Sequence, residues 1–437
     1  MTDGLDAITR GSIGFFWPCA EGIPDLDKDE PERGHIHIED RWAIIHVLEE
    51  DVEKSWLATD DELAPVAIVA LMADDAAVLL EVRGPYRKRW FGIRASSTRY
   101  DARTVVGGLD VTRLCSTDPL ALHAHFHGIS SWAGLTSLQE VSTMKPSGRL
   151  ESLTIELRGS GQRAVRIDGG RRIVMSSTWN VSGPSDQRIV NAPVAIGCET
   201  SRPRPTWELL QPLLHVQDLI NVAYGGFLAA IPGTAQMCLR PDQHDRFPST
   251  PWMWNGALMS PPKGASTPGT NSVPMFSLGT LGGFDSLRRW VRLARRHPRA
   301  VGPVVNLYRH GPSTPAVALL ETAAGIEYWV KSHRPAQWTT ASKYATSLAR
   351  KMGTAFADWI GDPQAWAKAF WQANNELKHE PTFSPDSNDL IDLAVSGRYL
   401  LTASILDQVA CSKAASRAIF GSHRLAETGR RLRERLS

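Results

Sequence analysis

The sequence predicts an α+β protein with a strand-rich front half and a helical back half, because the spacing of apolar residues changes along the chain. Up to about residue 195, apolar and polar residues alternate, which is typical of strands with one buried face. After about residue 300, apolar residues recur every three to four positions, as in amphipathic helices. We therefore predict a β-rich, sandwich-like domain (1–196), an α/β extension (197–299) and an all-α bundle (300–437).

Composition indicates a folded protein and argues against several classes of function. The 437 residues are 42% hydrophobic and 22% charged, with a formal net charge of +2, so any nucleic-acid site has to be local. Five widely spaced cysteines without a CxxC pair predict neither a zinc ribbon nor a disulfide framework. We see no signal peptide and no apolar run of membrane-spanning length, and expect a cytoplasmic protein without a membrane partner. The chain lacks the phosphate-loop and nucleophile-elbow motifs of ATPases and serine hydrolases.

Three stretches of the front half predict its strands. In residues 34–50, isoleucines alternate with histidines before a further apolar run. Residues 64–84 read as two strands joined at Asp74 and Asp75. Residues 151–179 predict a meander that turns at its glycines, with the leucines and isoleucine of its first strand on one face. Together these strands predict a sandwich or an open barrel with one buried face.

Helical periodicity begins in the middle of the chain. Residues 204–231 predict a helix that ends near glycines. Residues 240–274 are rich in Pro, Ser and Gly, and they predict a long loop. Residues 284–299 then predict a basic helix that stops near Pro298, since proline disrupts a helix interior.

The back half reads as a series of helices. We expect one helix over residues 314–333 and a second over residues 339–360. Asp362 followed by a proline is an N-cap signal that opens a third helix. Asp386 or Ser387 caps a long fourth helix, and an arginine-rich tail follows it.

The third of these helices ends in the segment NNELKH. At 100° per residue its apolar stripe faces the bundle core, and the stripe consists of Trp366, Phe370, Ala373 and Leu377. Asn375 and His379 lie four residues apart and nearly opposite the stripe, with Asn374 and Lys378 to one side. Trp371 falls between these pairs on the polar side. A polar helix face is most often solvated, but this tryptophan favours a covered surface, such as a dimer interface, or a stacking platform for a nucleobase.

The segment resembles the motif of HEPN domains, which has an Arg, commonly an Asn, and then a His at the end of a helix. Asn375 and His379 match that motif, and Asn374 stands where it has the Arg. The stretch LLETAAGIEYWVK resembles the first HEPN helix, with Glu327 at a frequently acidic position. In the front half, GFFWPCAEG, GHIHIED, AIVALM and RYDARTVVGGL look like the β-rich domain of ApeA-type abortive-infection proteins.

This resemblance implies a role in phage defence, in which the front half senses a phage-derived trigger and the helical half cleaves RNA. It implies a homodimer with a composite site that uses no metal or cofactor and leaves a 2′,3′-cyclic phosphate. His379 would be the general acid or base, since histidine titrates near neutral pH, and Asn375 would orient it or the phosphate. Trp371, Arg398 and Glu327 are the expected substrate-binding residues.

The uncharged residue at the arginine position leaves two alternatives open. In an active ribonuclease, the positive charge that Asn374 cannot provide comes from Lys378, one turn further on, or from Arg398 on the following helix. Otherwise the domain is catalytically inactive and only dimerises or binds RNA, coupled to a β-rich recognition domain.

Other clusters of polar residues carry weaker signals. Three histidines that alternate on one strand face suit zinc, but no Asp, Glu or Cys joins them at metal-binding spacing, so we expect no metal. They are His123, His125 and His127. Arginines near the middle and the end of the chain suit phosphate contacts, although such residues more often face solvent or pair with acids. They are Arg288, Arg292, Arg295 and Arg299, and in the tail Arg424, Arg430, Arg431, Arg433 and Arg435.

The chain holds 15 tryptophans, and those of the front half have two interpretations. They fill the core of the β-rich domain, or they belong to a module that recognises a carbohydrate or a peptide. In the second case the front half is a recognition module and the helical half a passive dimeriser. The residues concerned are Trp17, Trp42, Trp90, Trp132 and Trp179.

Overall fold

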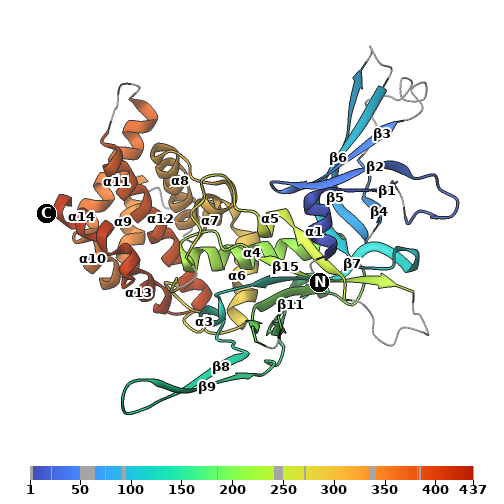
Figure 1. The fold of residues 1–437 in the computed structure, drawn as a ribbon. Coiled ribbons are helices and arrows are strands. Elements are labelled where there is room, and N and C mark those ends of the chain that lie inside the picture. Colours follow the sequence, from blue (N-terminus) through green and yellow to red (C-terminus); the bar gives the residue numbers. More distant parts are fainter. Residues whose placement is uncertain are drawn as a thin grey trace.

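A computed structural model of the chain shows strands gathered at one end of the molecule and helices at the other (Figure 1). The α+β class is therefore confirmed. No helix among the residues described is long and apolar enough to cross a membrane. The structure describes residues 3–20, 22–49, 64–73, 75–90, 95–184, 186–240, 250–269, 272–333, 341–380, 382 and 385–436.

Six antiparallel strands of the front half form a closed barrel. Their order around the ring is β6-β3-β2-β1-β4-β5, and β5 pairs again with β6. The bounds are β1 (Ser12–Cys19), β2 (Glu32–Glu39), β3 (Trp42–Glu49), β4 (Ala67–Met72), β5 (Ala76–Trp90) and β6 (Ala95–Gly107). The helix α1 (Asp3–Arg10) packs its buried Ile8 into the interior cluster of the barrel. Residues 64–84 form the predicted pair of strands, and the stretch 34–50, predicted to be strand-rich, forms the pair of β2 and β3; Asp74 lies outside the described residues.

A second run of strands continues from the barrel. The far end of β6 leaves β3 and pairs with β16, and the sheet extends in the order β16-β15-β7-β14-β11-β10. These strands are β7 (Leu114–Phe126), β10 (Arg163–Arg166), β11 (Arg172–Ser177), β14 (Val194–Glu199), β15 (Ile231–Leu239) and β16 (Trp252–Asn255). One strand, β6, is therefore shared by the barrel and the sheet that follows it.

The long loop predicted for residues 240–274 is wrong where β16 and the short helix α5 (Gly256–Met259) lie. All four residues of β16 are buried, because the strand fills the gap between β6 and β15. The prolines and glycines around it gave a loop signal, and the tertiary pairing overrides that signal. Residues 241–249 and 270–271 of the predicted loop lie outside the described part of the chain.

The predicted meander over residues 151–179 is only partly present. The hairpin of β10 and β11 forms as predicted, with a turn at 168–170. The preceding strand β9 (Leu150–Leu157) instead pairs with β8 (Leu138–Met144) in a separate hairpin that projects from the body (Figure 1). Leu153 and Ile155 are 51% and 44% exposed there, so the predicted buried face of this strand is wrong. A small hairpin of β12 (Asn180–Ser182) and β13 (Ile189–Asn191) completes the strands.

Helices connect this sheet to the back half. Helix α4 packs against β7 and β14, and α6 and α7 pack against α4. The bounds are α3 (Ser130–Ala133), α4 (Thr206–Tyr224), α6 (Asp285–Arg296) and α7 (Pro298–His310). We predicted a stop near Pro298, but this proline also opens α7, since the first turn of a helix requires no N–H.

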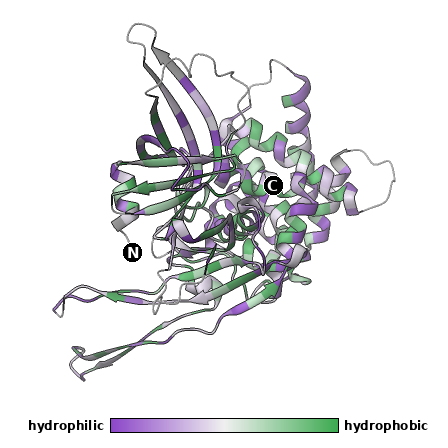
Figure 2. Ribbon diagram, turned by 90° about the vertical axis from the view of Figure 1, so that its right-hand side faces the viewer, coloured by the Kyte–Doolittle hydropathy of each residue, from purple (hydrophilic) through white to green (hydrophobic). Residues whose placement is uncertain are grey.

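The back half is a bundle around the long helix α12, as Figure 1 shows. Hydrophobic and hydrophilic residues mix along its helices (Figure 2). The bounds are α8 (Pro315–His333), α9 (Ala341–Met352), α10 (Thr354–Ile360), α11 (Pro363–His379), α12 (Ser387–Ala410), α13 (Ala414–Phe420) and α14 (Ala426–Leu436). The single helix predicted over residues 339–360 is divided at Gly353, whose φ of 73° only glycine adopts readily.

Helices α11 and α12 approach closely at Gly397. A Cβ atom at this position would lie 2.5 Å from Cε2 of Phe370. We therefore expect Gly397→Ala to lower the free energy of unfolding by about 1–3 kcal/mol, as overpacked cores do. Urea denaturation measures this change. Gly302→Ala in α7 is the matched control, because its Cβ meets only ordinary contacts and alanine favours the helix; equal destabilisation by both variants contradicts the packing argument.

Candidate functional site

Helix α11 forms where the sequence predicts it. Asp362 caps it, with its carboxylate accepting a hydrogen bond of 2.7 Å from the Gln364 backbone N–H. Trp366 and Phe370 are fully buried, and the Trp366 indole N–H donates to the Ser396 hydroxyl of α12 at 2.8 Å. These contacts fix the rotation of α11 about its axis and so decide which of its side chains face outward.

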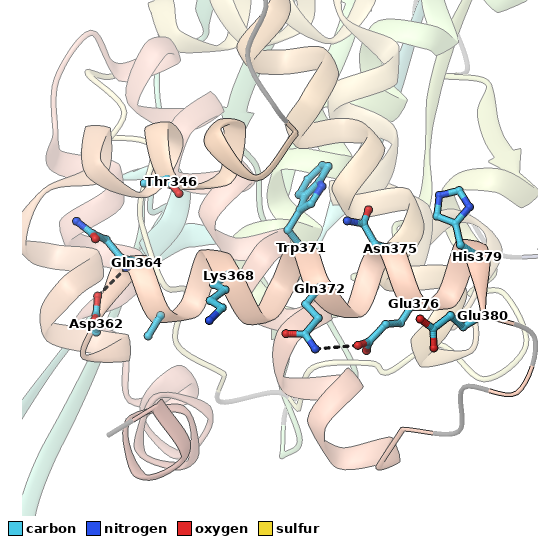
Figure 3. Close-up of a pocket in the computed structure, with 11 residues that line it drawn as sticks. Thr346, Asp362, Gln364, Lys368, Trp371, Gln372, Asn375, Glu376, His379 and Glu380 are labelled. Atoms are coloured by element: carbon cyan, nitrogen blue, oxygen red, sulfur yellow. Dashed lines mark hydrogen bonds between the residues drawn. The ribbon is translucent and has the colours of Figure 1, made fainter.

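The outward side of α11 lines an open cleft of about 860 Å³. Figure 3 shows Trp371, Asn375 and His379 on one side of the helix, in successive turns. Lys368 and Gln372 line the cleft from the helix's other flank, and the Gln372 amide donates to Glu376 at 2.8 Å. The complete lining is Thr346, Asp362, Gln364, Ala365, Lys368, Trp371, Gln372, Asn375, Glu376, His379 and Glu380.

The cleft brings together two of the predicted catalytic residues. Asn375 and His379 are both exposed, and His379 lies in the last turn of α11 as predicted. One turn separates them, so a ligand of nucleotide size in the cleft reaches both side chains. Pro381, which follows this helix, lies outside the described residues.

Trp371 lies on the same side of α11 as Asn375 and His379, as predicted, but it is buried within the chain itself (Figure 3). The residue is 5% exposed and is one of the side chains that line the cleft. Helix α9 packs along α11 and contributes Thr346 to the same cleft. A second neighbouring helix therefore covers a flank that a single apolar stripe would leave open.

Asn374, at the position of the motif arginine, does not face the cleft. It is fully buried, and its side-chain N–H donates to Asn375 Oδ1 at 3.4 Å. Its own Oδ1 atom has no partner among the described residues. A guanidinium at this position would be buried, so Asn374 supplies neither charge nor a direct contact in the cleft.

The two alternative sources of positive charge also lie elsewhere. Lys378 is exposed but is not among the residues that line the cleft. Arg398 lines a different cleft, of about 380 Å³, between α7, α8 and α12, with His310 as another of its lining residues. Its guanidinium carbon lies 5.4 Å from the ring centroid of Tyr399. Glu327 pairs with Lys331 along α8 and does not line the cleft of α11.

Lys368 and Gln372 are among the lining residues that sequence reasoning missed. Their signal was available, since positions 368, 372, 375 and 379 follow one another at intervals of three or four residues, so that each side chain lies near the next along the helix. Lys368 is the only lysine or arginine among the described residues that line this cleft. Along the axis it lies eleven residues, or about 16 Å, from His379 of the same chain.

The histidine row of β7 gains a carboxylate that its own strand does not supply. His123 lies 3.1 Å from Glu199, which the pairing of β7 with β14 brings alongside. Burial, together with His123 and His127, lowers the pKa of His125 to about 4. No group of three metal-binding side chains occurs among the residues described.

Most of the arginines weighed as phosphate contacts are engaged within the protein. Asp168 pairs with Arg292 and Arg295 at 3.0 and 3.5 Å, and Asp285 with Arg288 at 3.6 Å. Arg299 stands over the ring of Tyr328. In the tail, three arginines pair with acidic side chains, namely Arg430, Arg431 and Arg435. Two others, Arg424 and Arg433, donate to backbone carbonyls.

Comparison with known families decides what kind of protein carries this cleft. Residues 11–290, more than half of the chain, match the family described as ApeA N-terminal domain 1. The chain belongs to this family. Its membership in the ApeA family indicates an anti-phage, abortive-infection protein. The matched region runs from just before β1 into α6 and so ends before the helix that carries the cleft. No curated protein and no solved structure matches the chain.

Proposed function

We propose that this ApeA-family protein defends against phage by cleaving RNA, without a metal, in the cleft of α11. The supporting observation is the exposure of His379 and Asn375 in successive turns along one open cleft. We further propose that the N-terminal half holds this activity in check until a phage-derived trigger binds.

In the proposed reaction, the ribose 2′-oxygen forms a bond to phosphorus and the bond from phosphorus to the 5′-oxygen breaks. A base takes the proton of the 2′-hydroxyl, and an acid gives a proton to the departing 5′-oxygen. The products are a 2′,3′-cyclic phosphate and a 5′-hydroxyl. His379 performs one of these transfers, which is worth about 10²–10⁴-fold in rate. Asn375 orients the phosphate by hydrogen bonding from its amide.

A homodimer supplies the positive charge that Asn374 lacks. Lys368 is too far along α11 to serve His379 of its own chain. A second copy of α11 lying antiparallel across the cleft reverses that order and brings its lysine toward His379. The lysine of one copy then stabilises the negative charge that develops on the phosphoryl oxygens beside His379 of the other copy.

This arrangement predicts complementation between two inactive variants. We expect Lys368→Ala and His379→Ala each to lower RNA cleavage by at least about 100-fold. Mixed dimers of the two variants retain one site with both residues intact and recover up to half of the specific activity. Lys378→Ala is the control, since that lysine lies outside the cleft. A mixture as inactive as its components means that the lysine acts within one chain or not at all.

A second function is favoured by the missing arginine. Because Asn374 is uncharged and fully buried, the helical half has the features of a module that dimerises and binds RNA without cutting it. In that case the cleft binds RNA and leaves it uncut.

Purified protein with RNA and excess EDTA separates the two proposals. Cleavage that continues in the chelator and leaves 2′,3′-cyclic phosphate ends supports the ribonuclease. Intact RNA that co-migrates with the protein supports the binding module. Cleavage that stops in EDTA and returns with a divalent ion contradicts the metal-independent mechanism.

A further inference from the structure

The outer face of the barrel carries a row of rings and charges, at the opposite end of the molecule from α11 (Figure 1). The register of the strands places His35 opposite His46, His46 opposite Arg99, and Arg99 opposite Tyr86. Side chains at paired positions lie on the same face of a sheet. Their sequence neighbours are buried inside the barrel, so the row faces outward; those neighbours include Ile36, Ile45 and Tyr100.

Three histidine rings of this face stack on one another. The centroids of His35 and His37 lie 4.9 Å apart, and the rings of His37 and His46 are 5.9 Å apart with only 7° between their planes. Burial, followed by the charge of His35, lowers the pKa of His37, and burial, followed by Arg99, lowers the pKa of His46. The lowered pKa values favour the uncharged form of both rings.

Guanidinium groups lie on the same outer face of the barrel. The guanidinium carbons of Arg83 and Arg103 lie 4.5 and 4.7 Å from the ring centroid of Trp42, on the same outer face. Neither arginine hydrogen-bonds to a residue that the structure describes. Arg99 donates to Asp101 at 2.6 Å, yet its side chain remains 40% exposed. Positive charge is thus concentrated on one side of the barrel.

The row is long as well as charged. Ile13 of β1 lies opposite His35 and is 80% exposed, so the row crosses five strands from Ile13 to Tyr86, with partly exposed side chains between these two. At about 4.8 Å between strands, this is about 19 Å. A nucleic-acid strand rises about 3.4 Å per stacked nucleotide, so the row accommodates about five. Phe15, 43% exposed on β1, adds another ring beside it.

Single-stranded nucleic acid is the ligand that this combination fits. Such strands bind where rings stack with successive bases and nearby cations follow the phosphates. We propose that the outer face of the barrel binds single-stranded nucleic acid, with bases against the histidine and tyrosine rings and phosphates on Arg83, Arg99 and Arg103.

Fluorescence anisotropy of labelled oligonucleotides tests this site in the full-length chain. The His379→Ala variant is used so that binding is scored without cleavage, whatever the outcome for the proposed ribonuclease. We expect binding of RNA and DNA single strands of about 12 nucleotides, and weaker binding of the corresponding duplexes. Three phosphate contacts predict a slope of about −2 for log affinity against log salt. Tyr86→Ala is expected to weaken binding at least about fivefold, and Arg83→Ala with Arg99→Ala more.

Two exposed residues outside the barrel provide matched controls. Arg149 lies at the turn of the β8–β9 hairpin, and Trp179 is 46% exposed. Alanine at either position should leave oligonucleotide binding unchanged, and thermal melting checks that every variant is folded. The proposal is overturned if the protein binds no single strand, if the barrel variants bind as tightly as the parent, or if polyglutamate competes as well as RNA does.

Discussion

Replacing His379 with alanine is expected to abolish RNA cleavage and, with it, protection of cells against phage. Its imidazole is the only one among the described residues that line the cleft, and histidine is the side chain that most often acts as a general acid or base. Losing a positioned acid or base lowers a rate about 10²–10⁴-fold. The measurements are the rate of RNA cleavage in vitro and plaque formation on cells that express each variant.

Two variants define what a positive result means. His127→Ala removes an exposed histidine of the front half and should leave cleavage and protection intact. Asn375→Ala should give an intermediate loss, because it removes an orienting hydrogen bond but no proton transfer. Protection and RNA loss that both persist in His379→Ala exclude this histidine from the mechanism. If protection is lost in His379→Ala while cellular RNA stays intact both in that strain and in the wild-type strain, the binding module is favoured.

Replacing Arg309 with alanine is expected to lower the free energy of unfolding by about 3–5 kcal/mol. Its guanidinium joins α7 to α4 and α5 by donating to Asp218 at 2.5 Å, Gln217 at 2.8 Å and the backbone carbonyls of Leu214 and Ala257 at 2.6 and 3.1 Å. The side chains of Arg309 and Asp218 are only 14% and 7% exposed. Alanine therefore leaves a buried carboxylate without its main cation, which costs far more than the loss of a surface pair.

Thermal and chemical denaturation measure this effect, with a second arginine as reference. Arg288→Ala breaks an exposed pair with Asp285 at 3.6 Å and should cost about 0–1 kcal/mol. Arg309→Lys should fall between the two, because an ammonium retains the charge but cannot form the fork of hydrogen bonds. An Arg309→Ala protein as stable as Arg288→Ala shows that water or a rearranged side chain compensates the buried charge.

The local signals in the sequence were accurate where one element has one buried face. The cap at Asp362, the buried Trp366 and Phe370, and the exposed His379 in the last turn all follow from helical periodicity and capping chemistry. The strand β2, in which isoleucines alternate with histidines, follows in the same way from a period of two.

The errors occur where an element has more than one neighbour. Trp371 and Asn374 are buried although periodicity places them off the core stripe, because α9 packs against a second flank of α11. Residues 252–255 form a buried strand within a stretch rich in proline, because the gap between β6 and β15 requires one. Leu153 and Ile155 of β9 show the opposite error, because they were expected to be buried and are exposed. Within the described chain this strand pairs only with β8, and no second layer covers it.

The sequence by itself determined the α+β class, the boundaries of α11 and the outward direction of Asn375 and His379, since these depend on contacts within a few residues. Only the tertiary structure decided that the barrel closes, that its outer rings and arginines form one row, and that Lys368 rather than Lys378 or Arg398 shares the cleft with His379. These features depend on which strands and helices become neighbours, and that choice is made by packing between residues far apart in the chain.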